Sequence, residues 1–192
     1  MTSTQPSQLL ASLFQSIEED QRLSVFDVGP ARPETISFFS RYRSKLYLAD
    51  MFSELPLCAD QDHREALEQR FDELLQFPEN SRFDICLFWD LFNYLSPEAI
   101  EIFLRKLRPC LHADSKAHGF AVHNTRSPQG DQLYGIRQMD EFTVRHRDRP
   151  LPGYVPHNQG QLKSLLSCFS FERTVLLSDS RLELLLRFRP GS

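Results

Sequence analysis

The pattern of apolar and polar positions predicts strands and helices that alternate along most of the chain. Short apolar runs predict strands at residues 23–28, 46–50, 83–89 and 119–123. The run at 83–89 is apolar at nearly every position, which is typical of a central strand buried on both faces of a parallel sheet. Apolar residues at helical spacing predict helices at residues 33–42, 97–108 and 159–169, and at residues 65–75 either a helix or a helix with a short strand.

The two ends of the chain carry different patterns. Residues 171–177 and 181–189 predict two strands joined by a tight turn, and the second strand alternates apolar with charged residues. At the start, residues 1–6 show no apolar period and are expected to be disordered, whereas residues 7–19 carry one apolar stripe that predicts a helix. This helix either covers the sheet or closes over a ligand as a lid.

The segment 124–157 is richer in proline and glycine than the rest of the chain. The alternation of Phe142, Val144 and His146 with polar residues predicts one strand within it. A segment of this length between regular elements is commonly functional, so we expect an insertion that shapes a substrate pocket. The whole order predicts one α/β domain over residues 1–192. In it, a mostly parallel sheet is flanked by helices and ends in an antiparallel hairpin. A further strand is expected between the strands at 46–50 and 83–89, but the sequence pattern does not place it.

Composition narrows the class of protein. Of the 192 residues, 41% are hydrophobic and 25% charged, with a net charge of −4, as in ordinary globular proteins. No apolar run reaches the roughly 20 residues that span a bilayer, and the acidic balance disfavours a general nucleic-acid binder. The four cysteines form no CxxC pair, and the N-terminus has no basic region, so a reducing cytoplasm is expected.

Polar residues follow three predicted strands, at the edge where α/β sheets bind ligands. Asp27 ends the first strand, and Gly29 then breaks the chain before a helix that opens at Pro33, the unit that holds nucleotide-like ligands. Asp50 ends the second strand, where a carboxylate can accept hydrogen bonds from a ribose diol. Trp89 and Asp90 lie at the end of the strand predicted at 83–89. There an aromatic ring can cover a cation and a carboxylate can take a proton.

Each of these residues also has a purely structural alternative. Asp27 and Gly29 can serve only as a strand end and a turn, Asp50 and Asp90 as caps, and Trp89 as a core residue. The six histidines form no closely spaced pair of ligands, so no metal site is expected. The weaker candidates are Asn93, Tyr94, His123 and the basic strip Arg145, Arg147 and Arg149.

The order of elements and three motifs resemble the class I S-adenosylmethionine-dependent methyltransferases. The motifs are DVGPARP at 27–33, LYLAD at 46–50 and FDICLFWDLFNYLSPE at 83–98, and the resemblance runs from residue 23 to residue 189. The C-terminal antiparallel hairpin also matches this superfamily. The glycine-rich turn departs from the family pattern, since Gly29 is followed by Ala31 and Pro33 where glycines are common.

The resemblance implies a cofactor, a set of contacts and a reaction. It implies that Asp27, Gly29 and Ala31 lie at the methionyl end of S-adenosylmethionine and that Asp50 binds the ribose. Asp72 would contact adenine, Trp89 would cover the sulfonium or the adenine, and Asp90 would orient the methyl acceptor or take its proton. The acceptor, a small molecule or a protein, stays open.

Two alternatives to an active methyltransferase remain. A catalytically inactive relative would use the same fold as a ligand sensor or a scaffold for protein interactions. A nicotinamide-dependent oxidoreductase is disfavoured, because GxGxxG is absent and the terminal hairpin is foreign to that class.

Overall fold

A computed structural model describes residues 2–15, 17–18, 20–57 and 64–191. Its main sheet has six strands in the order β3-β2-β4-β5-β9-β8. The first four strands in this order are parallel, and β9 and β8 close the sheet as an antiparallel hairpin. The strands are β2 Leu23–Asp27, β3 Ser44–Leu48, β4 Phe83–Trp89, β5 Leu111–Val122, β8 Phe169–Leu176 and β9 Arg181–Phe188. The predicted fold class is therefore confirmed.

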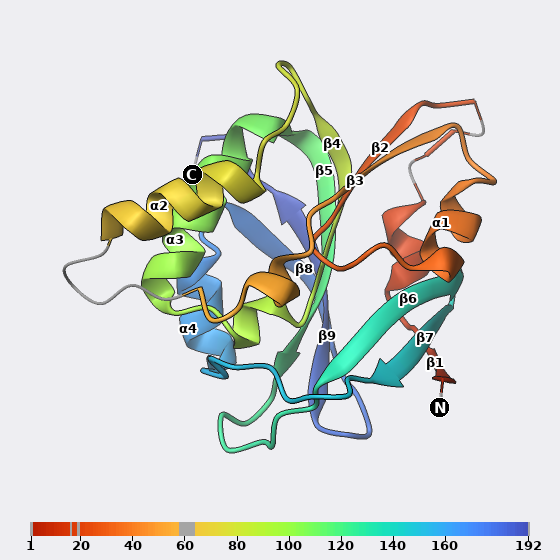
Figure 1. Cartoon of the computed structure of the whole chain (residues 1–192). Helices are drawn as coiled ribbons and strands as arrows, with labels where there is room; N and C mark the ends of the chain where they lie inside the picture. The colour runs from red at the N-terminus through yellow and green to blue at the C-terminus, as the bar shows by residue number, and fades with distance from the viewer. Residues whose placement is uncertain (1, 16, 19, 58–63, 192) are drawn as a thin grey trace.

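Helices cover one face of this sheet and a second small sheet stands on the other (Figure 1). The helices α2 Arg64–Leu74, α3 Pro97–Leu107 and α4 Gln159–Leu165 lie on the first face, and α1 Pro33–Phe39 lies on the second. The start of α3 is as predicted, since the Ser96 side chain accepts a hydrogen bond from the Ala99 amide and Pro97 takes the first helical position. No helix in the described part of the chain is long and apolar enough to cross a membrane.

The second sheet joins the start of the chain to the segment 124–157. Its order is β1-β7-β6, with β1 Thr2–Pro6, β6 Gln132–Gln138 and β7 Glu141–His146, all antiparallel. It packs on α1, where the Ile136 amide donates to Thr35 Oγ1 at 3.0 Å. Beside this bond Gly135 leaves no room for a side chain, since an added Cβ would lie 2.6 Å from Glu34 Cγ. The strand predicted around Phe142 is thus confirmed as β7.

The prediction for the N-terminus is wrong. Residues 2–6 form a strand rather than a disordered tail, and the predicted helix at 7–19 is replaced by one 3₁₀ turn at Leu10–Leu13. The side chains of the apolar stripe are nevertheless buried, since Leu9, Leu10 and Leu13 are at most 1% exposed. The short turn buries these side chains without a longer helix, and β1 exists because β7 supplies its hydrogen-bond partners.

Several predicted boundaries shift because pairing, not apolarity, sets where a strand begins. The second strand spans 44–48 rather than 46–50, since Ser44 already pairs with Leu23. The strand predicted at 119–123 begins at Leu111, and the helix predicted to reach residue 42 ends at Phe39. The sequence pattern also predicts Ile36 on the buried side of that helix, but Ile36 is 43% exposed and Phe38 is buried instead.

Between β3 and β4 the described residues contain no strand, only the 3₁₀ turn Met51–Glu54 and α2. The helix predicted at 65–75 is confirmed as α2. The sequence also predicts a loop at residues 53–62, and part of this loop lies outside the described residues. The third strand that the sequence could not place is absent from the described main sheet, where β3 forms the edge.

Candidate functional site

The candidate site lies where the order of the parallel strands reverses. From β2 the chain passes to β3 on one side and then crosses to β4 on the other, so β2 and β4 flank a topological switch point. Ligands of open α/β sheets bind outside the carboxyl ends of strands at such a point. Here these ends carry Asp27 and Gly29 from β2, Asp50 after β3, and Trp89 and Asp90 from β4.

Asp27 is a buried carboxylate with two donors at one oxygen. Its Oδ1 accepts a hydrogen bond from the Gly29 amide at 2.8 Å and another from Trp89 Nε1 at 2.6 Å. The pKa of Asp27 is raised to about 7, mainly by burial and to a smaller extent by the nearby Asp50 carboxylate, although both hydrogen bonds oppose the shift. A buried acid with a strongly shifted pKa at a strand end is a frequent mark of a functional site.

Gly29 is needed for close approach rather than for an unusual backbone angle. A Cβ added to Gly29 would lie 3.0 Å from Trp89 Nε1 and 3.1 Å from Asp27 Oδ1. The group that approaches this turn in the structure is therefore the indole of Trp89. The turn continues through Ala31, which is exposed, to Pro33 at the first position of α1.

The Trp89 side chain packs over the carboxyl ends of the paired strands β2 and β4, beside Asp27 and Gly29, and we call this place the crevice. Its side chain is 2% exposed, and its ring stacks on Tyr134 of β6 with 5.5 Å between centroids and an interplanar angle of 6°. Phe142 of β7 meets the same ring edge-on at 5.9 Å. The backbone of Trp89 has φ of 48°, a left-handed value that is rare for a bulky residue. The small sheet thus holds the indole over Asp27 and Gly29.

Asp50 and Asp72 take very different places. Asp50 is partly exposed just beyond β3 and caps the next 3₁₀ turn, with its Oδ1 3.3 Å from the Ser53 amide. It lies close enough to Asp27 to influence that acid's pKa. Asp72 lies on the exposed side of α2, where its Oδ1 is 2.5 Å from Lys106 Nζ of α3. The structure therefore brings Asp50 to the site and does not bring Asp72 there.

Asp90 lines a separate cavity that adjoins the crevice. The cavity has a volume of about 290 Å³, and Asp90 is 5% exposed in its wall. Burial raises the pKa of Asp90 to about 7, although the charge of Arg147 opposes the shift. Sequence reasoning named Asn93 and Tyr94 of this wall but missed Tyr134, Tyr154 and Arg181, which come from the segment 124–157 and from β9.

The remaining candidates contribute less. Arg147 of the basic strip lays its guanidinium over the Phe52 ring at 4.7 Å, whereas Arg145 faces Asp148 at 3.9 Å. His123 is exposed beyond the end of β5. Among the described residues, no three side chains of the metal-ligating types gather into a site.

The site fits S-adenosylmethionine in its chemistry but not in its open space. Asp27 and Asp50 are acids at the ends of adjacent parallel strands, as the cofactor's ammonium and ribose would require. The place beside Asp27 and Gly29 is, however, occupied by the side chain of Trp89. The first position of α1 has no amide hydrogen, and Glu34 beside it binds Arg32 and Thr143, so this helix start offers little to an anionic carboxylate.

Comparisons with known proteins agree on the fold. The sequence matches no protein-family model and no curated protein sequence at a significant level. A Burkholderia thailandensis 1,6-didemethyltoxoflavin-N1-methyltransferase, solved with S-adenosylhomocysteine bound, has a TM-score of 0.51 at 14% identity, over 94% of this chain and 77% of that one. The CcbJ methyltransferase of Streptomyces caelestis has a TM-score of 0.52 at 11% identity, over 94% of both chains.

A third neighbour sets a limit on the comparison. The mitomycin 7-O-methyltransferase MmcR has a TM-score of 0.53 at 14% identity, over 94% of this chain but only 53% of that one. The chain thus spans about half the length of some structures that it matches. At these identities the likeness establishes the architecture, and the chain has the fold of the class I S-adenosylmethionine-dependent methyltransferases.

Proposed function

We propose that this chain is a methyltransferase-like protein that binds S-adenosylmethionine in the crevice between β2 and β4 when Trp89 leaves it. The observation that carries the proposal is the buried Asp27 carboxylate at the switch point, held by the indole N–H of Trp89. Burying an acid is costly, so an acid kept at this position favours a role in binding. The indole N–H then stands in for the donor of a ligand.

The proposed contacts follow from where the side chains lie. Asp27 and the backbone of Gly29 and Ala31 would hold the methionyl end, and Asp50 would accept hydrogen bonds from the ribose diol. Asp90 would orient the acceptor or take its proton, for which a pKa of about 7 is well placed. Asp72 has no part in this arrangement because it is ion-paired on α2.

Trp89 makes the proposal specific. Since its indole occupies the crevice, cofactor and side chain would compete for the same space and the same carboxylate. The left-handed backbone of Trp89 is consistent with stored strain, which is concentrated at functional sites.

The test is a titration with S-adenosylhomocysteine, followed by calorimetry and by fluorescence. Trp89 is the chain's single tryptophan, so its emission reports on the crevice alone. We expect binding to shift that emission. We expect Trp89→Phe to bind about tenfold more tightly by calorimetry, because one hydrogen bond to Asp27 no longer has to be broken. Asp50→Asn, which retains a good capping residue, should weaken binding.

The outcomes separate two functions. Binding that leaves the emission of Trp89 unchanged would place the cofactor elsewhere and contradict the proposal. Absence of binding by both the unmodified protein and Trp89→Phe would favour the second candidate, a catalytically inactive relative that acts as a ligand sensor or scaffold. The specific observations in favour of this second candidate are the filled crevice and the loss of an amide donor at Pro33.

A further inference from the structure

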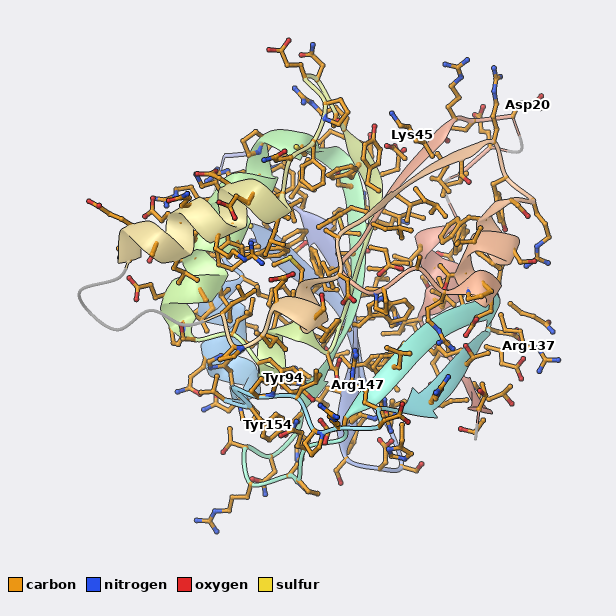
Figure 2. All side chains as sticks on the ribbon, in the orientation of Figure 1. Asp20, Lys45, Tyr94, Arg137, Arg147 and Tyr154 are labelled. Atoms are coloured by element: carbon orange, nitrogen blue, oxygen red, sulfur yellow. The ribbon has the colours of Figure 1, made fainter. Side chains whose placement is uncertain are left out.

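A second ligand site is indicated by the cavity beside Asp90. It lies beyond the carboxyl ends of β4 and β5, between the 3₁₀ turn Leu91–Asn93, the loop at 127–130 and the turn before β9. Figure 2 shows Tyr94 and Tyr154 together at this edge of the molecule, with Arg147 close by. The volume of about 290 Å³ corresponds to about ten waters, and so to a ligand of about ten non-hydrogen atoms.

Asp90 is the group that this cavity leaves without a partner. Its Oδ1 is buried and accepts no hydrogen bond in the described part of the chain. Buried polar atoms are rarely left this way, because an unmet hydrogen bond costs about 1–3 kcal/mol. The other acid of the cavity is satisfied, since Asp179 Oδ2 is 2.6 Å from Arg181. An acceptor is therefore available at Asp90 and not at Asp179.

The cation that lines the cavity, Arg181, is already engaged. Arg181 binds Asp179 and also donates to the Tyr134 hydroxyl at 2.7 Å. Arg147, whose charge acts on Asp90, does not line the cavity; its guanidinium packs over Phe52, and its Nε is buried without a hydrogen-bond partner among the described residues. The cavity thus presents an unpaired carboxylate rather than a free cation, which favours a ligand that donates hydrogen bonds and carries positive charge.

The walls of the cavity are aromatic. The rings of Tyr94 and Tyr154 are 5.5 Å apart at 58°, and Tyr134 adds a third ring. Aromatic faces attract cations and bury flat apolar groups.

A second, larger hollow of about 800 Å³ lies beside Phe38 and Met139 and is open to solvent. Unlike the Asp90 cavity, it is lined by no side chain that has a buried polar atom without a partner in the described part of the chain.

We propose that the Asp90 cavity binds a small amine with a flat apolar body, its ammonium on the Asp90 carboxylate and its body among the tyrosine rings. Because the cavity adjoins the Trp89 crevice through Tyr134, the amine would be the methyl acceptor under the proposed function. The binding itself rests only on the groups of the cavity and needs no cofactor.

The test uses 2-phenylethylamine as the probe and 2-phenylethanol as its neutral counterpart of the same size. Both are titrated into the full chain without cofactor, by calorimetry. The amine should bind at least about tenfold more tightly than the alcohol, because its contact with Asp90 is charge-assisted. Asp90→Asn, which keeps the shape of the side chain, should weaken the amine about tenfold and leave the alcohol unchanged.

Asp179→Asn is the matched control, because Asp179 is an acid of the same cavity but is already paired with Arg181. It should reduce amine binding far less than Asp90→Asn does. Equal losses in the two variants would show general attraction by negative charge and overturn the proposal. Equal affinity for amine and alcohol, or no amine binding up to about 10 mM, would overturn it as well. None of these results depends on whether S-adenosylhomocysteine binds.

Discussion

Asp27 and Asp90 are two buried acids whose protonation should govern how stability depends on pH. Burial raises the pKa of each from the model-compound value of 3.8 to about 7. Between these values the unfolded chain has released the proton while the folded chain keeps it. The free energy of unfolding therefore falls as pH rises through this window, by up to about 4 kcal/mol per acid.

The corresponding prediction compares Asp27→Asn with the unmodified protein in urea at pH 5 and pH 7.5. The amide oxygen can still accept from Gly29 and Trp89, but it never ionises. The variant should lose less stability than the unmodified protein between the two pH values. An identical loss in both proteins would mean that Asp27 ionises in the folded state near its ordinary pKa.

At the same scale, the sequence predicted which residues lie at the carboxyl ends of the strands, but not the directions of their side chains. Asp27, Gly29, Trp89 and Asp90 could be found because each follows a strand whose apolar run is evident. The position of the Trp89 ring in the crevice could not be found, because it depends on Tyr134, more than forty residues later. Asp72 does not join the site because it lies on the exposed side of α2, where it pairs with Lys106 of α3.

At the scale of elements, one buried acid ties the N-terminal segment to the main sheet. Glu183 of β9, expected on a polar face, is completely buried. It accepts hydrogen bonds from the Gln8 amide at 3.0 Å and the Ser7 hydroxyl, and its Oε1 lies 2.9 Å from His118 Nε2. Burial raises the pKa of Glu183, but these hydrogen bonds outweigh it and leave the pKa below its usual value.

We predict that Glu183→Gln lowers the free energy of unfolding by about 2–4 kcal/mol, because it breaks a buried charged network while keeping its shape. Amide hydrogen exchange in β1 should also accelerate, since Ser7 and Gln8 lose their anchor. Glu172→Gln is the control, because Glu172 pairs with Arg187 on the surface and should cost less than about 1 kcal/mol. Similar losses in both variants would argue against the anchor.

The dependence of β1 on distant partners also explains why the sequence pattern gave a wrong prediction for the N-terminus. Residues 2–6 carry no apolar alternation, and a strand of exposed polar residues is defined only by its partner. That partner, β7, is more than 130 residues away, and the buried Glu183 is farther still. In contrast, the start of α3 was predictable because Ser96 and Pro97 fix it locally.

At the scale of the whole molecule, the arrangement is a methyltransferase-like sheet with a small second sheet closing its ligand edge. The main sheet could be predicted from the order of elements, since sequential strand and helix patterns leave few parallel topologies. The second sheet could not, because it combines strands from the two halves of the chain. It matters for function because Tyr134 and Phe142 hold Trp89 in place.

The docking of this second sheet can be tested at Gly135, where β6 meets α1. A Cβ there would lie 2.6 Å from Glu34 Cγ and 2.7 Å from Thr143 Oγ1, so Gly135→Ala must displace Glu34 and strain its bond to Thr143. We expect a loss of about 1–3 kcal/mol in the free energy of unfolding. We also expect red-shifted, more quenchable emission from Trp89, because Tyr134 adjoins Gly135 on β6.

Gly130→Ala provides the matched control, because its added Cβ would meet only Gln132 atoms at 3.7–3.8 Å, an ordinary contact. It should change neither stability nor emission appreciably. If Gly135→Ala lowered stability while the emission of Trp89 stayed that of a buried ring, the small sheet would not be what holds Trp89 in the crevice. Closure would then have to come from the bond between Trp89 and Asp27 alone, and Asp27→Asn, which preserves an acceptor, would leave the crevice closed as well.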